Sequence, residues 1–160
     1  MPNNIIKDGV IVEDQWQLLE TAATDIPEGA VIVPVSVWND QKDQLSGREQ
    51  VGVWLDSDES PQLIADDLDN FAMVAINFPA VADGRGFSYG RELRELHNFK
   101  GEIRAIGNFI RDQLFYLQRC GFNAFALNEV DLEQALDSFK DFSECYQAAT
   151  DQPEPLFKRR

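Results

Sequence analysis

The sequence contains little of what metal sites and disulfide frameworks are built from. Its 160 residues include one histidine and two cysteines, and Cys120 and Cys145 form no Cys-x-x-Cys pair. We therefore expect no metal site and interpret both cysteines as reduced, buried thiols. His97 falls near the end of a predicted helix, where a cation is favoured in any case, so we interpret it as structural.

Long hydrophobic runs and positive charge are also scarce. No run approaches the roughly 20 apolar residues that a membrane helix needs, and the start MPNNIIKDG lacks the basic-then-apolar layout of a secretory signal. The 28 acidic residues outnumber the 14 basic ones, which gives a formal net charge of −14. Such a surface repels nucleic acids and anionic membranes, so neither is expected as a partner. We expect a cytoplasmic protein.

The few basic residues are unevenly distributed. Residues 85–119 contain seven of the lysines and arginines against four acidic residues, which gives this segment a net charge of +3 and leaves −17 for the rest. Two interpretations remain open at this point. Either these arginines pair with the surrounding acidic residues, or they form a local site for an anion.

The length and the apolar content of 44% predict one folded domain over residues 1–150, with a loose tail at 151–160. Residues 4–19 are predicted as an N-terminal β-hairpin, because Asp8-Gly9 is a strong tight-turn signal between two β-branched runs.

Apolar runs alternate with helical patterns through the rest of the chain. The predicted strands are residues 30–38, 51–55, 71–78, 102–107 and 124–127. The predicted helices are 41–45, 61–68, 87–96, 108–120 and 131–149. Strands that alternate with helices form βαβ units and a mainly parallel sheet. The predicted fold is therefore α/β, with about five strands and helices on both faces, either flavodoxin-like or a partial barrel.

The stretch INFPAVADGRGFSYGRELRE contains the main candidate site. Ligands of parallel sheets bind outside the carboxyl ends of the strands, and Asp83-Gly84-Arg85-Gly86 follows a predicted strand. The two glycines permit positive φ, which suits a nest of N–H groups facing an anion, and Ser88 can cap the helix or donate a hydroxyl. The alternative is a tight turn in which Asp83 pairs locally with Arg85.

Arginines also stand where helix N-termini prefer negative charge. Arg85 and Arg91 flank the start of one predicted helix, and Arg111 lies in the first turn of another. Both starts follow parallel strands, so we expect them at the same edge of the sheet. A bound anion would remove the conflict with the helix dipoles, and this favours an anion site. The residues assigned to it are Asp83, Gly84, Arg85, Gly86, Ser88, Arg91 and Arg111.

No cofactor motif is recognised. The spacing of Gly84, Gly86 and Gly90 is one residue longer than a dinucleotide fingerprint, and there is no P-loop or nucleophile elbow. The cofactor stays unknown, and no catalytic residue is assigned. The aromatic residues in RDQLFYLQRCGFNAFAL are interpreted mainly as core, although a homodimer or partner surface that includes Phe115 and Tyr116 stays open.

Two blocks, FPAVADGRGFSYGRELR and GEIRAIGNFIRDQLFYLQRCGFNAFAL, resemble an uncharacterised bacterial family of small proteins. The likeness extends from about Val51 to Phe142. Members of this family are typically encoded beside sulfite reductase genes and are labelled as oxidoreductases of sulfite reduction. The matching positions include Asp83, Arg85 and Arg111.

The resemblance implies a role in assimilatory sulfite reduction. Because no flavin, nicotinamide, iron–sulfur or dithiol site is recognised, we expect an accessory protein with a small anion (sulfite, sulfate or phosphate) or sulfite reductase itself as its partner. Two alternatives remain open. One is an oxidoreductase of the same pathway, and the other is a protein–protein interaction module without a small-molecule site.

Overall fold

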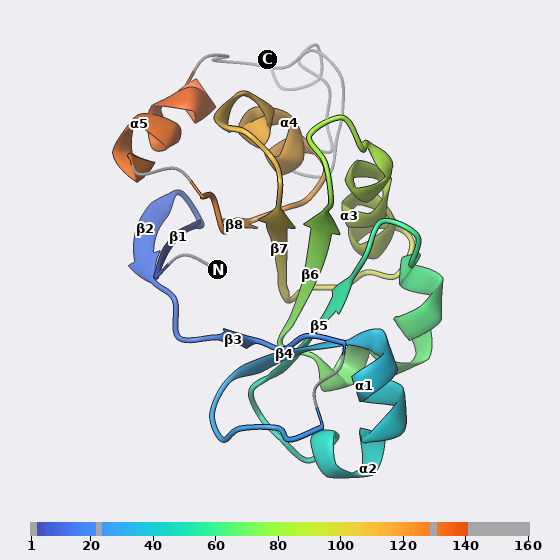
Figure 1. Cartoon of the computed structure of the whole chain (residues 1–160). Coiled ribbons are helices and arrows are strands. Elements are labelled where there is room, and N and C mark those ends of the chain that lie inside the picture. Colours follow the sequence, from blue (N-terminus) through green and yellow to red (C-terminus); the bar gives the residue numbers. More distant parts are fainter. Residues whose placement is uncertain (1–2, 22–23, 129–130, 141–160) are drawn as a thin grey trace.

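The computed structural model describes residues 3–21, 24–128 and 131–140, and eight strands of these residues form one sheet (Figure 1). The strands are β1 (Asn4–Lys7), β2 (Val10–Glu13), β3 (Gln17–Leu18), β4 (Val31–Pro34), β5 (Val51–Leu55), β6 (Met73–Phe78), β7 (Glu102–Gly107) and β8 (Ala124–Phe125). They lie in the order β2-β1-β8-β7-β6-β5-β4-β3.

The sheet is mixed and larger than the sequence predicts. All neighbours from β3 to β8 are parallel, whereas β1 is antiparallel to both β2 and β8. The predicted α/β fold is confirmed, but the prediction of about five strands is wrong. Residues 17–18 add a sixth parallel strand, and the N-terminal hairpin joins the same sheet beside β8.

The sheet curls until its two edge strands come close. β2 and β3 are at opposite ends of the strand order, yet only residues 14–16 separate them in the chain. In a flat sheet, seven strand spacings of about 4.8 Å would separate these edges by about 34 Å. The connection from residue 13 to residue 17 reaches at most roughly 14 Å. This geometry fits the partial-barrel alternative and not the flavodoxin-like one.

Over the described residues, the helices cover the outer, convex face of the sheet (Figure 1). The helical elements are α1 (Val35–Asp40), α2 (Lys42–Leu45), η1 (Pro61–Asn70), α3 (Arg85–Glu95), η2 (Arg111–Gln113), α4 (Leu114–Arg119), α5 (Leu132–Asp137) and η3 (Ser138–Lys140), where η denotes a 3₁₀ helix. None of those in the described residues is long and apolar enough to cross a membrane.

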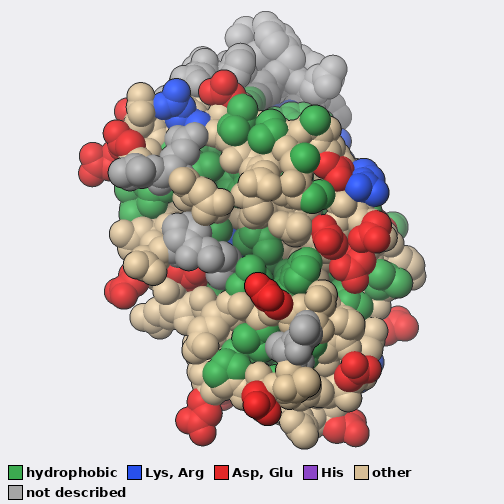
Figure 2. Space-filling view, viewed as in Figure 1, with side chains coloured by type: hydrophobic (Ala, Val, Ile, Leu, Met, Phe, Trp, Pro, Cys, Tyr) green, Lys and Arg blue, Asp and Glu red, His purple; other side chains and the backbone are tan. Residues whose placement is uncertain are grey.

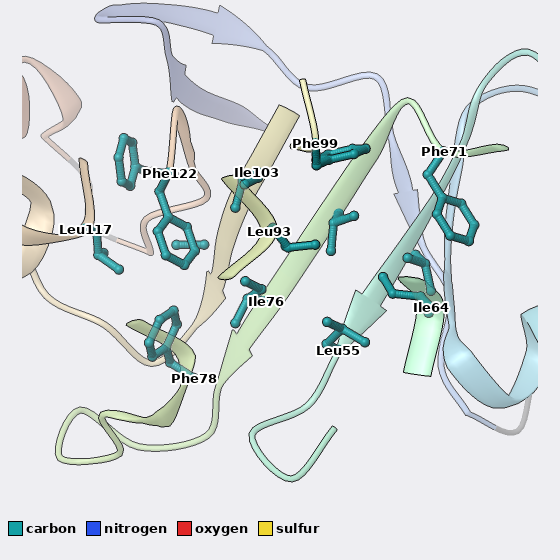
Figure 3. Packing of buried hydrophobic residues seen from close by; sticks show 14 of the residues in the cluster. Leu55, Ile64, Phe71, Ile76, Phe78, Leu93, Phe99, Ile103, Leu117 and Phe122 are labelled. Atoms are coloured by element: carbon teal, nitrogen blue, oxygen red, sulfur yellow. The ribbon is translucent and has the colours of Figure 1, made fainter. Parts of the chain in front are cut away.

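The two faces of each strand show this arrangement. Ile76 of β6 points outward and belongs to the main core with Leu93 of α3 and Leu117 of α4 (Figure 3). Met73 and Ala75 of the same strand point inward, into a smaller cluster that contains no helical residue in the described chain. The prediction of helices on both faces is wrong for the described residues, because crossovers of one hand between sequentially ordered strands place their helices on one side of the sheet.

Several predicted boundaries also shift. The run predicted as a strand over 30–38 leaves the sheet at Pro34, and Trp38 of α1 stacks edge-on against Phe71 and donates a hydrogen bond to Asp67.

The hairpin is confirmed for β1 and β2, with positive φ at the Asp8-Gly9 turn. Residues 61–70 form a 3₁₀ helix, and residues 141–149, Cys145 and the tail 151–160 lie outside the described residues.

A buried ion network fastens the N-terminal segment to the sheet. Arg104 of β7 is 1% exposed, and its guanidinium lies 2.8 Å from Glu102 and 3.0 Å from Asp14, both nearly buried. Lys7 of β1 adds a further contact to Glu102 at 3.1 Å. The network joins β1, β7 and the β2–β3 connection, so it holds together the strands on which the curl depends.

Candidate functional site

The carboxyl ends of β5, β6 and β7 meet at one edge of the sheet because these strands are parallel neighbours. The segments that follow them are here called the β5 loop (residues 56–60), the β6 loop (79–84) and the β7 loop (108–110). The β6 loop leads directly into α3, and the β7 loop leads into η2. This is the edge at which parallel sheets place their ligands.

Backbone and side-chain hydrogen bonds tie the β6 and β7 loops together. The Asn108 N–H donates to the carbonyl of Phe78 at 2.7 Å, and its Nδ2 donates to the carbonyl of Pro79 at 2.8 Å. Gln113 Nε2 donates to the carbonyl of Val81 at 3.1 Å. The two loops therefore form one connected surface.

Arg85 is held in a fixed orientation on this edge. Its Nε donates to Asp83 Oδ1 at 3.1 Å and its Nη2 to Asp83 Oδ2 at 2.7 Å, which is a bidentate pair. Nη2 also donates to Ser57 Oγ of the β5 loop at 2.8 Å. The side chain stays 58% exposed, and Nη1 has no hydrogen bond to the described residues. The local Asp83–Arg85 pair, which the sequence analysis kept as an alternative, is therefore present, and one end of the Arg85 guanidinium still faces solvent.

The contacts at this edge shift the pKa values of three side chains, Asp83, Arg85 and Tyr89. Hydrogen bonds from Arg85 lower the pKa of Asp83 from 3.8 to about 2, and the same pair raises the pKa of Arg85. Tyr89 of α3 donates its hydroxyl to the Ser57 carbonyl at 2.6 Å, and burial raises the pKa of that phenol. Asp83 and Arg85 are both charged, and Tyr89 is neutral, at every pH near neutrality.

The Asp83 carboxylate should make stability depend on pH in acid. Its folded pKa lies below its unfolded value, so its contribution is fully present above about pH 4 and is lost as the pH falls towards 2. Wild type and Asp83→Asn should therefore differ in Tm by a constant amount from pH 5 to 7. Thermal unfolding from pH 2 to 7 measures this difference, which should shrink below pH 4. A difference that stays constant down to pH 2 would contradict the pairing.

The two glycines of the loop lack the positive φ that an αL nest needs, and only Gly86 has a packing role. Neither Gly84 nor Gly86 adopts positive φ. A Cβ on Gly86 would lie 2.7 Å from the Phe78 ring, so this glycine lets α3 approach β6 closely. Ser88 donates its hydroxyl to the carbonyl of Arg85 at 2.8 Å, within the first turn of α3.

The structure separates the other two predicted arginines. Arg91 lies about 9 Å further along α3 than Arg85, at 1.5 Å per residue, and contacts the Cys120 thiol. Burial raises the pKa of that thiol, and Arg91 offsets part of the rise. Arg111 starts η2 at the carboxyl edge, and its guanidinium has no hydrogen bond or ion pair to the described residues. Arg85 and Arg111 thus share the edge, and Arg91 does not.

Arg94, which also belongs to the family-like motif, is structural. Its guanidinium donates to the backbone carbonyls of Gly121, Phe99 and Gly101 at 2.7–3.0 Å. It therefore ties the C-terminal end of α3 to two neighbouring loops, far from the carboxyl edge.

The sequence analysis missed the partners that orient the edge. Ser57 joins the β5 loop to α3, Asn108 joins the β7 loop to the β6 loop, and Gln113 joins η2 to the β6 loop. None of these residue types attracts notice in the sequence as a binding residue. The available signal was position, because Asn108 directly follows the predicted strand at 102–107 and Ser57 is the second residue after the predicted strand at 51–55. In the part of the chain that the structure describes, no three His, Cys, Asp or Glu side chains gather as metal ligands would.

The fold and these loops define an α/β protein with a curled, mixed sheet and with polar loops at the carboxyl edge of its parallel strands. The chain belongs to a family of bacterial proteins of unknown function, DUF934, whose model matches residues 52–157. This confirms the membership of an uncharacterised bacterial family that the sequence motifs indicate. No curated protein and no solved structure matches the chain.

Proposed function

We propose that the protein is an accessory factor of assimilatory sulfite reduction that binds a small oxyanion or the reductase at the carboxyl edge of its sheet. The sulfite assignment rests on the resemblance of its motifs to a family encoded beside sulfite reductase genes. The observation that carries the binding role is the Arg85 guanidinium, which is oriented by Asp83 and Ser57 and exposed at its other end.

Preorganisation favours this role for Arg85. An arginine that is already held loses less side-chain freedom on binding than a mobile one, so more of each hydrogen bond contributes to affinity. Arg111 starts η2 directly after the β7 loop, and its guanidinium has no partner among the described residues, so we propose it as a second cation for the same ligand.

The charge of the protein limits which anions fit. At a net charge of −14 the molecule repels small anions at long range. Binding therefore depends on short, directional contacts, which favour an oxyanion with two or more acceptor oxygens over a simple halide. Sulfite, sulfate and phosphate all meet this requirement.

Growth of a bacterium that lacks the gene tests the physiological part of the proposal. Deletion should slow growth on sulfate or sulfite as the sole sulfur source and leave growth on sulfide unchanged, because sulfide enters after the reduction. A wild-type copy should restore the growth rate, whereas Arg85→Ala should not.

The matched control is Lys100→Ala, which removes one exposed positive charge away from the carboxyl edge and should restore growth fully. Equal growth of the deletion strain on sulfite and on sulfide would refute the assignment to sulfite reduction. Full rescue by Arg85→Ala would refute the role of this edge.

A further inference from the structure

A cavity lies between the N-terminal hairpin and α5, away from the carboxyl edge. Figure 1 shows α5 beside β1 and β2, and residues of α5 contact both strands. The cavity has a volume of about 470 Å³, which falls in the usual range for small-molecule sites. Asn123, which lines it, directly precedes β8, so the cavity is at the amino end of that strand. It is called the hairpin cavity below.

Part of the lining is apolar. Phe125 of β8 is 2% exposed and packs on Phe139 of η3, with ring centroids 5.4 Å apart. Leu136 of α5 also lines the cavity and packs against the same core. Such a surface binds methylene groups through the hydrophobic effect, and aromatic rings attract cations. It gives no comparable gain to a hydrated metal ion.

Three carboxylates also line the cavity, and they come from two separate parts of the chain. Asp8 lies in the hairpin turn, whereas Glu133 and Asp137 lie one helical turn apart on the same face of α5. Asn123 Nδ2 donates to Asp8 Oδ1 at 3.1 Å, and the Asp8 N–H donates to the carbonyl of Asn123 at 2.9 Å. These two bonds hold Asp8 in place, and they leave its Oδ2 without a hydrogen bond to the described residues.

The basic side chains around these carboxylates are engaged elsewhere. Arg94 interacts electrostatically with Asp8, but its guanidinium donates to three backbone carbonyls and to Asn123 Oδ1. Lys7 adjoins Asp8 in the chain, but its ammonium lies 3.1 Å from Glu102. Among the described residues that line the cavity, none is a lysine or an arginine. The wall of the cavity is therefore negative, and its charge selects a cation.

The placement of the carboxylates favours an organic cation over a metal ion. In the part of the chain that the structure describes, no three carboxylate, cysteine or histidine side chains converge as metal ligands would. A ligand with positive charges set apart on an aliphatic chain can instead meet the hairpin turn and α5 at once. Its methylene groups then lie against Phe125, Leu136 and Phe139. Aliphatic polyamines have this chemistry.

We propose that the hairpin cavity binds an aliphatic polyamine, with ammonium groups at Asp8 and Glu133 and with the methylene groups against the apolar part of the lining. This inference goes beyond the oxyanion site and does not depend on the sulfite assignment. The net charge of −14 also attracts polyamines to the whole surface, and Figure 2 shows acidic side chains spread over the face that it draws. The test therefore separates a specific site from this diffuse attraction.

The test titrates putrescine and spermidine into the full chain by calorimetry, at about 0.15 M salt, where exposed charges more than about 8 Å apart are largely screened. Wild type should bind each amine at one saturable site per chain. Asp8→Asn combined with Glu133→Gln should weaken binding about tenfold or more, because two charge-assisted contacts are lost. Asparagine also tolerates the positive φ of Asp8, so the turn should persist.

The matched control combines Asp43→Asn with Glu49→Gln, which removes two exposed carboxylates outside the cavity. It should leave the affinity within about twofold of wild type, because screened charges at a distance contribute little. Glu133→Gln alone leaves the hairpin untouched and should still weaken binding. Nuclear Overhauser effects from the putrescine methylene protons to the rings of Phe125 and Phe139 should place the ligand in the cavity.

Two further ligands test the stated chemistry. Butylamine carries one ammonium on the same four-carbon chain as putrescine and should bind more weakly, because it cannot meet the hairpin turn and α5 together. Mg²⁺ has the charge of putrescine without its methylene groups and should not displace it. No saturable binding, an equal loss in the cavity and control variants, equal affinity for butylamine and putrescine, or displacement of putrescine by an equal concentration of Mg²⁺ would each overturn the proposal.

Discussion

Replacing Arg104 by methionine is expected to lower the free energy of unfolding by about 3–5 kcal/mol, because a buried ion network loses its central cation. Arg104 is 1% exposed and contacts Glu102 and Asp14 at 2.8 and 3.0 Å. Methionine fills a similar space but leaves both carboxylates without their main partner. Urea unfolding followed by tryptophan fluorescence measures the difference.

The matched control for this variant is Arg111→Met, which removes a half-buried arginine with no partner in the described residues. It should change the free energy of unfolding by no more than about 0.5 kcal/mol. Equal effects of the two substitutions would show that the Arg104 network does not hold the N-terminal hairpin to β7. A smaller loss, near 1 kcal/mol, would mean that water reaches the network in solution.

Replacing Arg85 by alanine is expected to remove most of the stabilisation that a bound oxyanion gives. At 100 times its Kd, a ligand adds about 2.7 kcal/mol to the free energy of unfolding, which raises Tm by several degrees in a domain of this size. Loss of charge-assisted hydrogen bonds should weaken binding about 10- to 100-fold. The same ligand concentration then adds only about 0.4–1.4 kcal/mol, and a thermal-shift panel with sulfite, sulfate and phosphate measures the change.

Two features separate a binding defect from a folding defect in this experiment. Without ligand, Arg85→Ala should unfold near the wild-type temperature, because its pair with Asp83 is exposed and such pairs contribute little. Lys100→Ala should keep the full ligand-induced shift. If Arg85→Ala unfolds at a much lower temperature than wild type without ligand, the role of Arg85 is structural.

Local signals predicted the elements that depend on neighbouring residues. The Asp8-Gly9 turn and the run at 102–107 both appear where the sequence places them, because turn chemistry and β-branched runs act over short distances. The prediction of one strand over residues 30–38 was wrong beyond Pro34. Trp38 contacts Phe71 and Asp67, which lie some 30 residues away in the chain, and these contacts favour a helix over a longer strand.

The candidate site was predictable in place but not in detail. Parallel topology puts Arg85 and Arg111 at one edge whatever the strand order, and the structure agrees on that point. Arg91 was misplaced because a helix carries it away from the edge towards Cys120, on a face that periodicity alone did not reveal. The contacts that organise the edge span long stretches of chain, 28 residues for Ser57 with Arg85 and 32 for Gln113 with Val81. No local pattern encodes such pairs.

The measurement that tests the binding role of the carboxyl edge most directly is a calorimetric titration of sulfite into the purified protein, repeated with Arg85→Ala. The account predicts one saturable site per chain in the wild type, with affinity reduced about 10- to 100-fold by the substitution. Absence of binding to the wild type, or equal binding by both proteins, would contradict the proposed oxyanion site.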